Sequence, residues 1–172
     1  MRNLPRASLL DHLNRAEKKV TTNKYCARAD LQNESSVEQF FVSRCLKDLG
    51  YTDREIKPKT SLKEIAVARG TRREPFKPDY VIVYRRKPRW LIDAKSPTED
   101  VDKWSYQGAG YALGLNQEYS AENPCDFYAI TNGLAFKVYK WDESPPILSL
   151  TFSDFEDDNR SEERRVGKEC RL

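Results

Sequence analysis

Two short apolar runs on either side of a basic segment are the feature of the sequence that most constrains the fold. The runs are Tyr80–Tyr84 and Trp90–Ile92, within the stretch PDYVIVYRRKPRWLIDAK at residues 78–95. Their β-branched and aromatic residues predict two antiparallel strands, and residues 85–89 suit the connection between them. The stretch is therefore predicted to form a β-hairpin.

Three ionisable residues stand at the open end of this predicted hairpin. Asp93 and Lys95 are expected on the same face of their strand, because side chains alternate along a strand. Asp79 opens the partner strand and is expected to approach them. Two carboxylates beside an ammonium group suit phosphodiester hydrolysis, since Mg²⁺ takes hard oxygen ligands, polarises the phosphoryl oxygen and acidifies a bound water. The alternative is an ordinary charged surface hairpin. A carboxylate and a lysine directly after an apolar strand are, however, unfavourable in a hydrophobic core, which indicates a functional reason for them.

A helix is predicted over 34–49. Asn33 can cap its N-terminus, and Gly50 stands where a C′ glycine belongs. Glu34 and Glu38 both fall within the apolar arc of this helix, and an acid that faces the core needs a partner, for which a metal is one candidate. The alternative for either residue is complementarity to the helix dipole, which we favour for Glu38.

A second helix is predicted over about 99–115, with Thr98 as its cap. Gln107 and Tyr111 are four residues apart, so they share a helix face, which is expected to look back at the hairpin. Helix packing is the alternative explanation for that face. The two glycines between them lower helix propensity and allow close backbone approach, which favours a face directed at the site.

A second hairpin completes the predicted sheet. Its strands are 127–131 and 134–141, joined across Asn132 and Gly133, which is a strong type I′ turn signal. Together the segments predict an α/β sandwich with a central mixed sheet of at least four strands flanked by helices.

The remaining segments carry weaker signals. Residues 8–20 suggest an amphipathic helix, within an N-terminal helical segment over 1–30. A short helix is predicted near 61–66, followed by a loop over 70–77. Residues 153–172 lack apolar periodicity and are expected to be disordered, with a vector-derived tail from about residue 160.

Charge is unevenly distributed, although the net charge is only +3. Residues 54–95 hold thirteen Lys and Arg and five acids, whereas residues 96–159 hold three basic residues and twelve acids. The basic tract is expected to surround the site and to attract a phosphate backbone, with double-stranded DNA as the partner. A solvated charged face is the alternative.

Other classes of protein fit the sequence poorly. The four cysteines are widely separated and the only histidine is His12, which is expected at the surface; these residues do not give the usual zinc spacings or a Ser-His-Asp triad. No apolar run approaches a membrane span, and no secretory signal is recognisable, so the cytoplasm is the expected location.

The order of the motifs resembles the PD-(D/E)xK nuclease superfamily, and within it the N-terminal nuclease domain of type I restriction enzyme R subunits. The resemblance covers roughly residues 30–141. It is carried by NESSVEQFFVSRCLKDLGY (33–51), KPDYVIVY (77–84), LIDAKSP (91–97), QGAGY (107–111) and TNGLAFKVY (131–139).

This resemblance implies a restriction-endonuclease-like nuclease domain over 31–152. It implies Glu34, Asp79 and Asp93 as metal ligands and Lys95 as the catalytic lysine. Gln107 and Tyr111 match the Gln-x-x-x-Tyr motif of the type I and RecB-like branches. Asp93 replaces the glutamate that is common in the family, and this shorter side chain leaves the metal geometry open.

The expected activity is therefore that of a Mg²⁺-dependent DNA endonuclease domain of a restriction-modification system, with Mn²⁺ as a second candidate ion. Relatives in this family act with translocase, methyltransferase or specificity subunits, and the sequence contains no Walker A or G-x-G-x-x-G motif of its own. The alternative is a catalytically silent nucleic-acid-binding or assembly module with the same fold. A metal-free structural domain is the third candidate.

Overall fold

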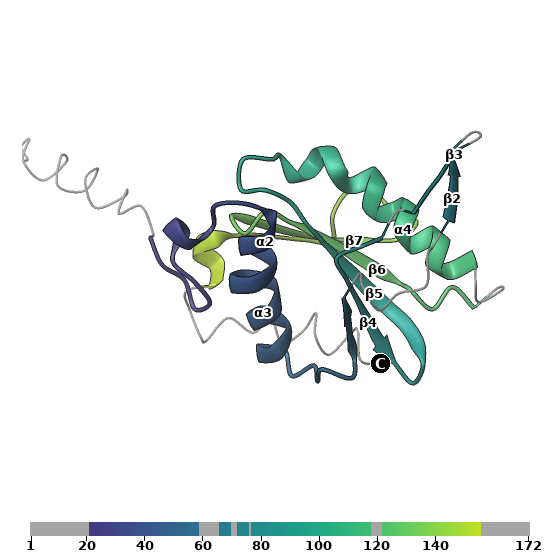
Figure 1. Ribbon diagram of the computed structural model, residues 1–172, viewed down its shortest axis with the longest axis horizontal. Coiled ribbons are helices and arrows are strands. Elements are labelled where there is room, and N and C mark those ends of the chain that lie inside the picture. The colour runs from purple at the N-terminus through teal and green to yellow at the C-terminus, as the bar shows by residue number, and fades with distance from the viewer. Residues whose placement is uncertain (1–20, 59–65, 70–71, 76, 118–121, 156–172) are drawn as a thin grey trace, which may run out of the picture.

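The computed structural model describes residues 21–58, 66–69, 72–75, 77–117 and 122–155 (Figure 1). The helix predicted over 8–20 and the tail predicted from about residue 160 lie outside the described residues. Within the described part, every helix is too short or too polar to cross a bilayer.

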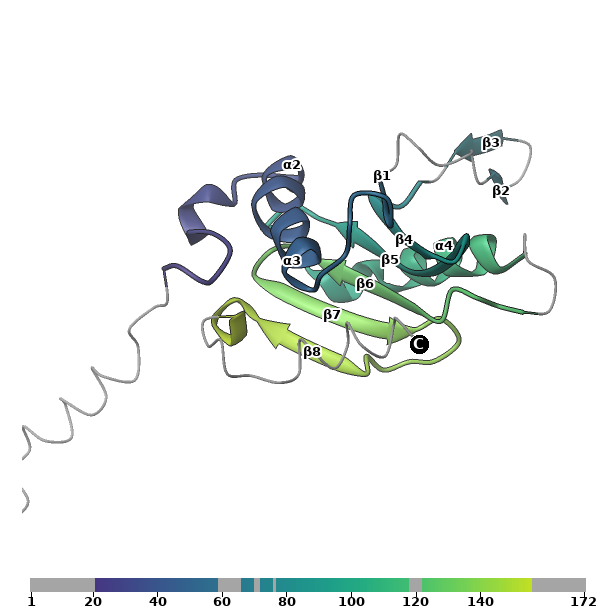
Figure 2. The same ribbon diagram turned by 90° about the horizontal axis from the view of Figure 1, so that it is seen from below.

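A six-stranded mixed sheet forms the centre of the molecule, with the strand order β1-β4-β5-β6-β7-β8 (Figure 2). β5 and β6 pair in parallel, and the other neighbours pair antiparallel. A parallel pair needs a crossover connection, which here carries a helix. The predicted α/β class and mixed sheet are confirmed. The strands are β1 Ile56–Pro58, β4 Tyr80–Tyr84, β5 Lys87–Ala94, β6 Phe127–Thr131, β7 Ala135–Lys140 and β8 Leu148–Thr151.

The first hairpin has a tighter turn than predicted. Tyr84 pairs with Lys87, so only Arg85 and Arg86 form the turn, with φ of 51° and 66°. Two successive residues at positive φ match the twist of the flanking strands, which makes a two-residue connection favourable. The prediction that residues 87–89 belong to the connection is therefore wrong. Pro88 lies within β5 and pairs with Val83 of β4, next to the register shift between Ile82 and Val83.

A separate two-stranded sheet occupies part of the region where a helix and a loop were predicted. β2 (Ala66–Arg69) pairs antiparallel with β3 (Arg72–Pro75). The helix prediction is wrong at residue 66, and the loop prediction is wrong for residues 72–75, while 61–65 lie outside the described residues. Strand pairing uses backbone groups, so a short charged segment can join a sheet without showing an apolar alternation.

One face of the sheet is covered by a continuous helical segment that begins at Glu34. It consists of α2 Glu34–Ser36, the π-helical stretch η2 Val37–Val42 and α3 Ser43–Asp48. Asn33 caps it by accepting a hydrogen bond from the Ser36 amide at 2.9 Å, and Gly50 follows it with φ of 83°. The predicted helix and both of its end signals are confirmed. Its apolar side packs on even-numbered residues of β4 and β5, including Ile82, Trp90 and Ile92.

The opposite face is covered by the crossover between β5 and β6 (Figure 1). This contains the 3₁₀ turn η4 Val101–Trp104 and then α4 Ser105–Gln117. Asp100 caps η4 by accepting from the Asp102 amide, so the predictions of Thr98 as the cap and of a helix from residue 99 are wrong. Odd-numbered residues of β4 and β5, including Val81 and Leu91, form the core under α4 together with Tyr128 and Ile130 of β6.

The turn between β6 and β7 is not the predicted type I′ turn. Gly133 has φ of 79°, but Asn132 does not adopt a positive φ, which a type I′ turn requires of both central residues. The Asn132 side-chain oxygen instead accepts hydrogen bonds from the amides of Leu134 and Ala135, at 2.9 and 2.8 Å. A side-chain turn of this kind is an ordinary local alternative for asparagine.

The core extends past both boundaries expected for the domain, residues 31 and 152. Tyr25 and Phe155 both pack against Phe41, with ring centroids 5.7 and 5.0 Å away. Phe155 is 2% exposed and belongs to the 3₁₀ turn η5 Phe152–Phe155. The prediction that disorder begins at residue 153 is therefore wrong for Ser153–Phe155.

Candidate active site

The predicted acidic pair and lysine meet where β5 ends and β4 begins. Asp79, Asp93 and Lys95 are buried, at 4%, 3% and 9% exposed. The Ala94 amide donates a hydrogen bond to Asp79 Oδ2 at 2.7 Å, which fixes the first carboxylate beside the end of β5. The Lys95 amide donates to the carbonyl of Thr131 at 2.7 Å and so ties the lysine to β6. The predicted approach of these three residues is confirmed, and their catalytic roles stay a prediction.

Asp93 and Lys95 form a buried ion pair. Lys95 Nζ lies 2.6 Å from Asp93 Oδ2. Burial raises the pKa of the Asp93 carboxyl to about 6; Lys95 opposes this rise, and the negative charges of Asp79 and Glu34 add to it. Carboxyl groups whose pKa is raised by burial, even with a lysine nearby, are common in catalytic sites.

A compact group of carboxylates lies beside this pair. One oxygen each from Glu34, Glu38 and Asp79 lies within 4.8 Å of the others. The two glutamates come from one helical segment and are four residues apart, which places them on the same face. Sequence reasoning favoured Glu34 over Glu38 and assigned Glu38 to the helix dipole. The structure brings both residues to Asp79, whereas Asp93 directs an oxygen to Lys95.

The chemistry of these donors fits a hard divalent cation. All of them are carboxylate oxygens, the ligand type that Mg²⁺ and Mn²⁺ prefer. Opposite ligands of an octahedral Mg²⁺ lie about 4 Å apart, so three oxygens within 4.8 Å need to move by less than about 1 Å to share one ion. The helical segment changes to π geometry at Val37, and such changes are frequent at functional sites.

Gln107 and Tyr111 face the site from α4, as predicted. Gln107 Nε2 donates to the Tyr111 hydroxyl at 2.8 Å. Burial raises the pKa of Tyr111, and the negative charges of Asp93 and Asp79 raise it further. The Tyr111 hydroxyl is therefore close enough to these two carboxylates to feel their charge. Gln107 Oε1 is buried and has no hydrogen-bond partner in the described part of the chain. The role of this pair in catalysis stays a prediction.

Gly108 contributes to packing between α4 and the sheet. A Cβ atom at this position would lie 2.3 Å from the Tyr128 side chain, so the glycine lets α4 pack closely on β6. The close approach expected from the sequence is real, but it is a packing contact. At Gly110 a Cβ would meet nothing within 4 Å.

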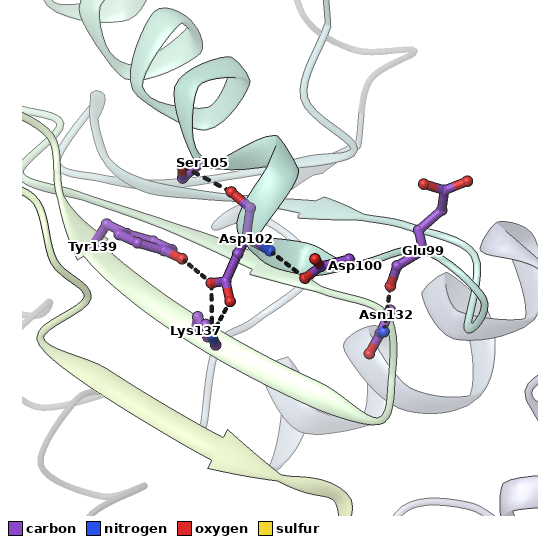
Figure 3. A network of polar contacts seen from close by, with 7 residues as sticks. All are labelled: Glu99, Asp100, Asp102, Ser105, Asn132, Lys137 and Tyr139. Carbon is purple, nitrogen blue, oxygen red and sulfur yellow. Dashed lines mark hydrogen bonds and ion pairs between the residues drawn. The ribbon is translucent and has the colours of Figure 1, made fainter.

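A polar network that sequence reasoning missed holds the connection between β5 and α4 (Figure 3). Lys137 Nζ on β7 contacts both carboxylate oxygens of Asp102 in η4, at 2.5 and 2.7 Å, and the Tyr139 hydroxyl donates to Oδ1 at 3.3 Å. Lys137 holds the pKa of Asp102 below its ordinary value. Asn132 Nδ2 donates to the Glu99 carbonyl at 2.8 Å. The start of the crossover is therefore anchored to the second hairpin.

The basic turn lies at the other end of the first hairpin, so this part of the basic tract does not surround the site as expected. Arg86 and Asp93 are seven positions apart in the sequence, which corresponds to roughly 23 Å along a strand. Near that turn, Lys87 forms an ion pair with Glu122.

Comparison with known proteins gives two structural likenesses. One is to the protein in the DrdV–DNA complex solved by cryo-electron microscopy, with 13% identity, a TM-score of 0.42 and coverage of 72% of this chain and 74% of that chain. The other is to the type IIG restriction endonuclease BpuSI, with 15% identity, a TM-score of 0.46 and coverage of 81% of this chain. This chain matches 16% of the length of BpuSI. No protein-family model and no curated protein matches the sequence.

Proposed function

We propose that this chain is a metal-dependent DNA endonuclease domain of a restriction system, with Mg²⁺ as the resident ion and Mn²⁺ as its substitute. The observation that carries the proposal is the convergence of buried Asp79, Asp93 and Lys95 with the carboxylates of Glu34 and Glu38. Acids from a helix and from two strands meet one lysine at the end of the sheet. A structural domain gains little from such a cluster, because buried like charges destabilise the fold.

Each side chain has a role that follows from its position. Asp79, Glu34 and Glu38 would hold the cation through carboxylate oxygens, and Asp93 is placed to contribute an oxygen while it orients Lys95. The bound ion would polarise the phosphate and lower the pKa of a water molecule.

Lys95 provides the positive charge at the buried end of β5. Its ammonium group can donate hydrogen bonds to the attacking water or to a phosphate oxygen as negative charge develops. Gln107 carries a buried amide oxygen close to the same place and can accept a hydrogen bond from the water or a bound nucleotide. The reaction class that fits these roles is hydrolysis of a phosphodiester bond.

A plasmid-nicking assay tests the proposal. Supercoiled DNA is incubated with the protein in Mg²⁺, in Mn²⁺ and in EDTA, and DNA binding is measured in parallel. Nicking that requires the metal supports the endonuclease. The silent-module alternative predicts DNA binding of equal strength with no nicking in any buffer. The translocase, methyltransferase or specificity subunits expected from the family resemblance would be sought as partners that co-purify with the protein.

A further inference from the structure

The ring of Trp104 lies directly against the candidate catalytic lysine. Lys95 Nζ is 4.5 Å from the centroid of this ring and 2.6 Å from Asp93 Oδ2. An ammonium group within about 6 Å of an indole face is attracted by the ring quadrupole, and the attraction is stronger where water is excluded. Lys95 is 9% exposed, so the contact lies in such a place.

The ring is itself held in place from two directions. Trp104 Nε1 donates to Glu99 Oε2 at 3.3 Å, and the side chain packs against the core under α4. Trp104 is the last residue of η4, the turn that Lys137 and Tyr139 hold through Asp102 (Figure 3). The β6–β7 hairpin therefore helps to hold the turn that carries the ring, through contacts that do not involve Lys95.

A lysine side chain needs such support to act at a defined point. Its four-carbon stem is flexible, and a catalytic group must be held within about half an ångström of its working position. Asp93 holds the ammonium group on one side, and the indole face holds it on another.

We propose that Trp104 is a positioning residue for Lys95, which fixes the ammonium group through its ring face. This inference rests on the proposed nuclease function for its catalytic consequence, but the geometry that it assigns can be tested without cleavage. The competing explanation is that Trp104 only covers the core, as buried aromatic residues often do. The two explanations make different predictions for the variants. A positioning role predicts that phenylalanine at residue 104 restores cleavage better than leucine does, whereas a covering role predicts no such difference.

The test uses three matched variants. Trp104→Leu keeps an apolar cover and removes the ring, Trp104→Phe keeps a ring face, and Trp141→Leu removes another half-buried tryptophan beside the same core, at the far end of β7. Single-turnover cleavage and DNA affinity are measured for each, after thermal unfolding confirms that they are folded. We expect Trp104→Leu to cut about tenfold more slowly at unchanged DNA affinity, Trp104→Phe to recover most of the rate, and Trp141→Leu to match the parent.

A nuclear magnetic resonance measurement on lysine-labelled protein supplies the readout that is independent of activity. Lys95 Nζ lies over the indole ring in the parent, so the signal of the adjoining ε-methylene protons should be shifted upfield. The shift should vanish in Trp104→Leu and persist in Trp141→Leu. An unshifted signal in the parent overturns the proposal, as does cleavage by Trp104→Leu at the parental rate, or a Phe variant no better than the Leu variant. A shifted signal in a parent that does not cut DNA would refute the nuclease function and leave the positioning of Lys95 supported.

Discussion

Replacing Asp93 with asparagine should stabilise the metal-free protein at neutral pH. Asp93 is 3% exposed, and its pKa rises from an ordinary 3.8 to about 6, chiefly through burial. The folded protein thus holds this proton more tightly than the unfolded chain does. Stability from this group is fully present below about pH 4 and is lost as the pH rises through about 6.

The magnitude follows from the same shift. A rise from 3.8 to about 6 corresponds to at most ~3 kcal/mol of unfolding free energy lost once the carboxylate ionises. The attraction of Lys95 is already part of this balance, because Lys95 opposes the rise. Asparagine mimics the protonated acid, so Asp93→Asn should gain about 1–3 kcal/mol at neutral pH and nothing near pH 4.

Urea unfolding in EDTA at several pH values between 4 and 8 measures this difference for the parent and the variant. A variant that is less stable than the parent at neutral pH, or a difference that does not change with pH, would refute the reasoning. It would mean that the ion pair with Lys95 outweighs the cost of burying the carboxylate.

Other predictions concern the metal, the packing and the DNA. Asp79→Asn and Glu38→Gln should each weaken Mg²⁺ or Mn²⁺ binding by at least about tenfold in calorimetry, because each removes a charged oxygen ligand; unchanged affinity in both would remove the proposed ligands. Gly108→Ala should lower the unfolding free energy by about 1–3 kcal/mol through its clash with Tyr128, whereas Gly110→Ala, which meets nothing within 4 Å, should raise it by about 0.5–1 kcal/mol. DNA binding should fall steeply between low and moderate salt and differ little between duplex sequences, since phosphate contacts carry no sequence information; one mapped cleavage site on unrelated plasmids would contradict this.

Local signals in the sequence predicted the central elements well. The predicted run Tyr80–Tyr84 coincides with β4 at both of its ends, because it consists entirely of β-branched and aromatic residues, which favour strands. Asn33 and Gly50 marked the ends of the first helical segment through the conformations that those residues favour. The edge strands β1 and β8 were missed, since each has only three or four residues and depends on a neighbour for its hydrogen bonds.

The candidate site was predictable to the extent that it is built from one hairpin. The register of β4 and β5 brings Asp79 to the end of β5, and alternation places Lys95 beside Asp93. The contributions of Glu38 and Trp104 depend on how a helix and a 3₁₀ turn pack on the sheet. No spacing rule in the sequence encodes that packing.

The measurement that tests the central claim most directly is metal-dependent cleavage by the parent, Lys95→Ala and Lys140→Ala under the same conditions. Lys140 is a matched control, because it is an exposed lysine paired with Glu143 at the end of β7 away from the site. We predict that the parent and Lys140→Ala nick plasmid in Mg²⁺ and that Lys95→Ala binds DNA but does not cut it, because the wider basic surface supplies affinity while Lys95 acts on the transition state. Equal cleavage by Lys95→Ala and the parent would contradict the assignment of this site as the catalytic centre.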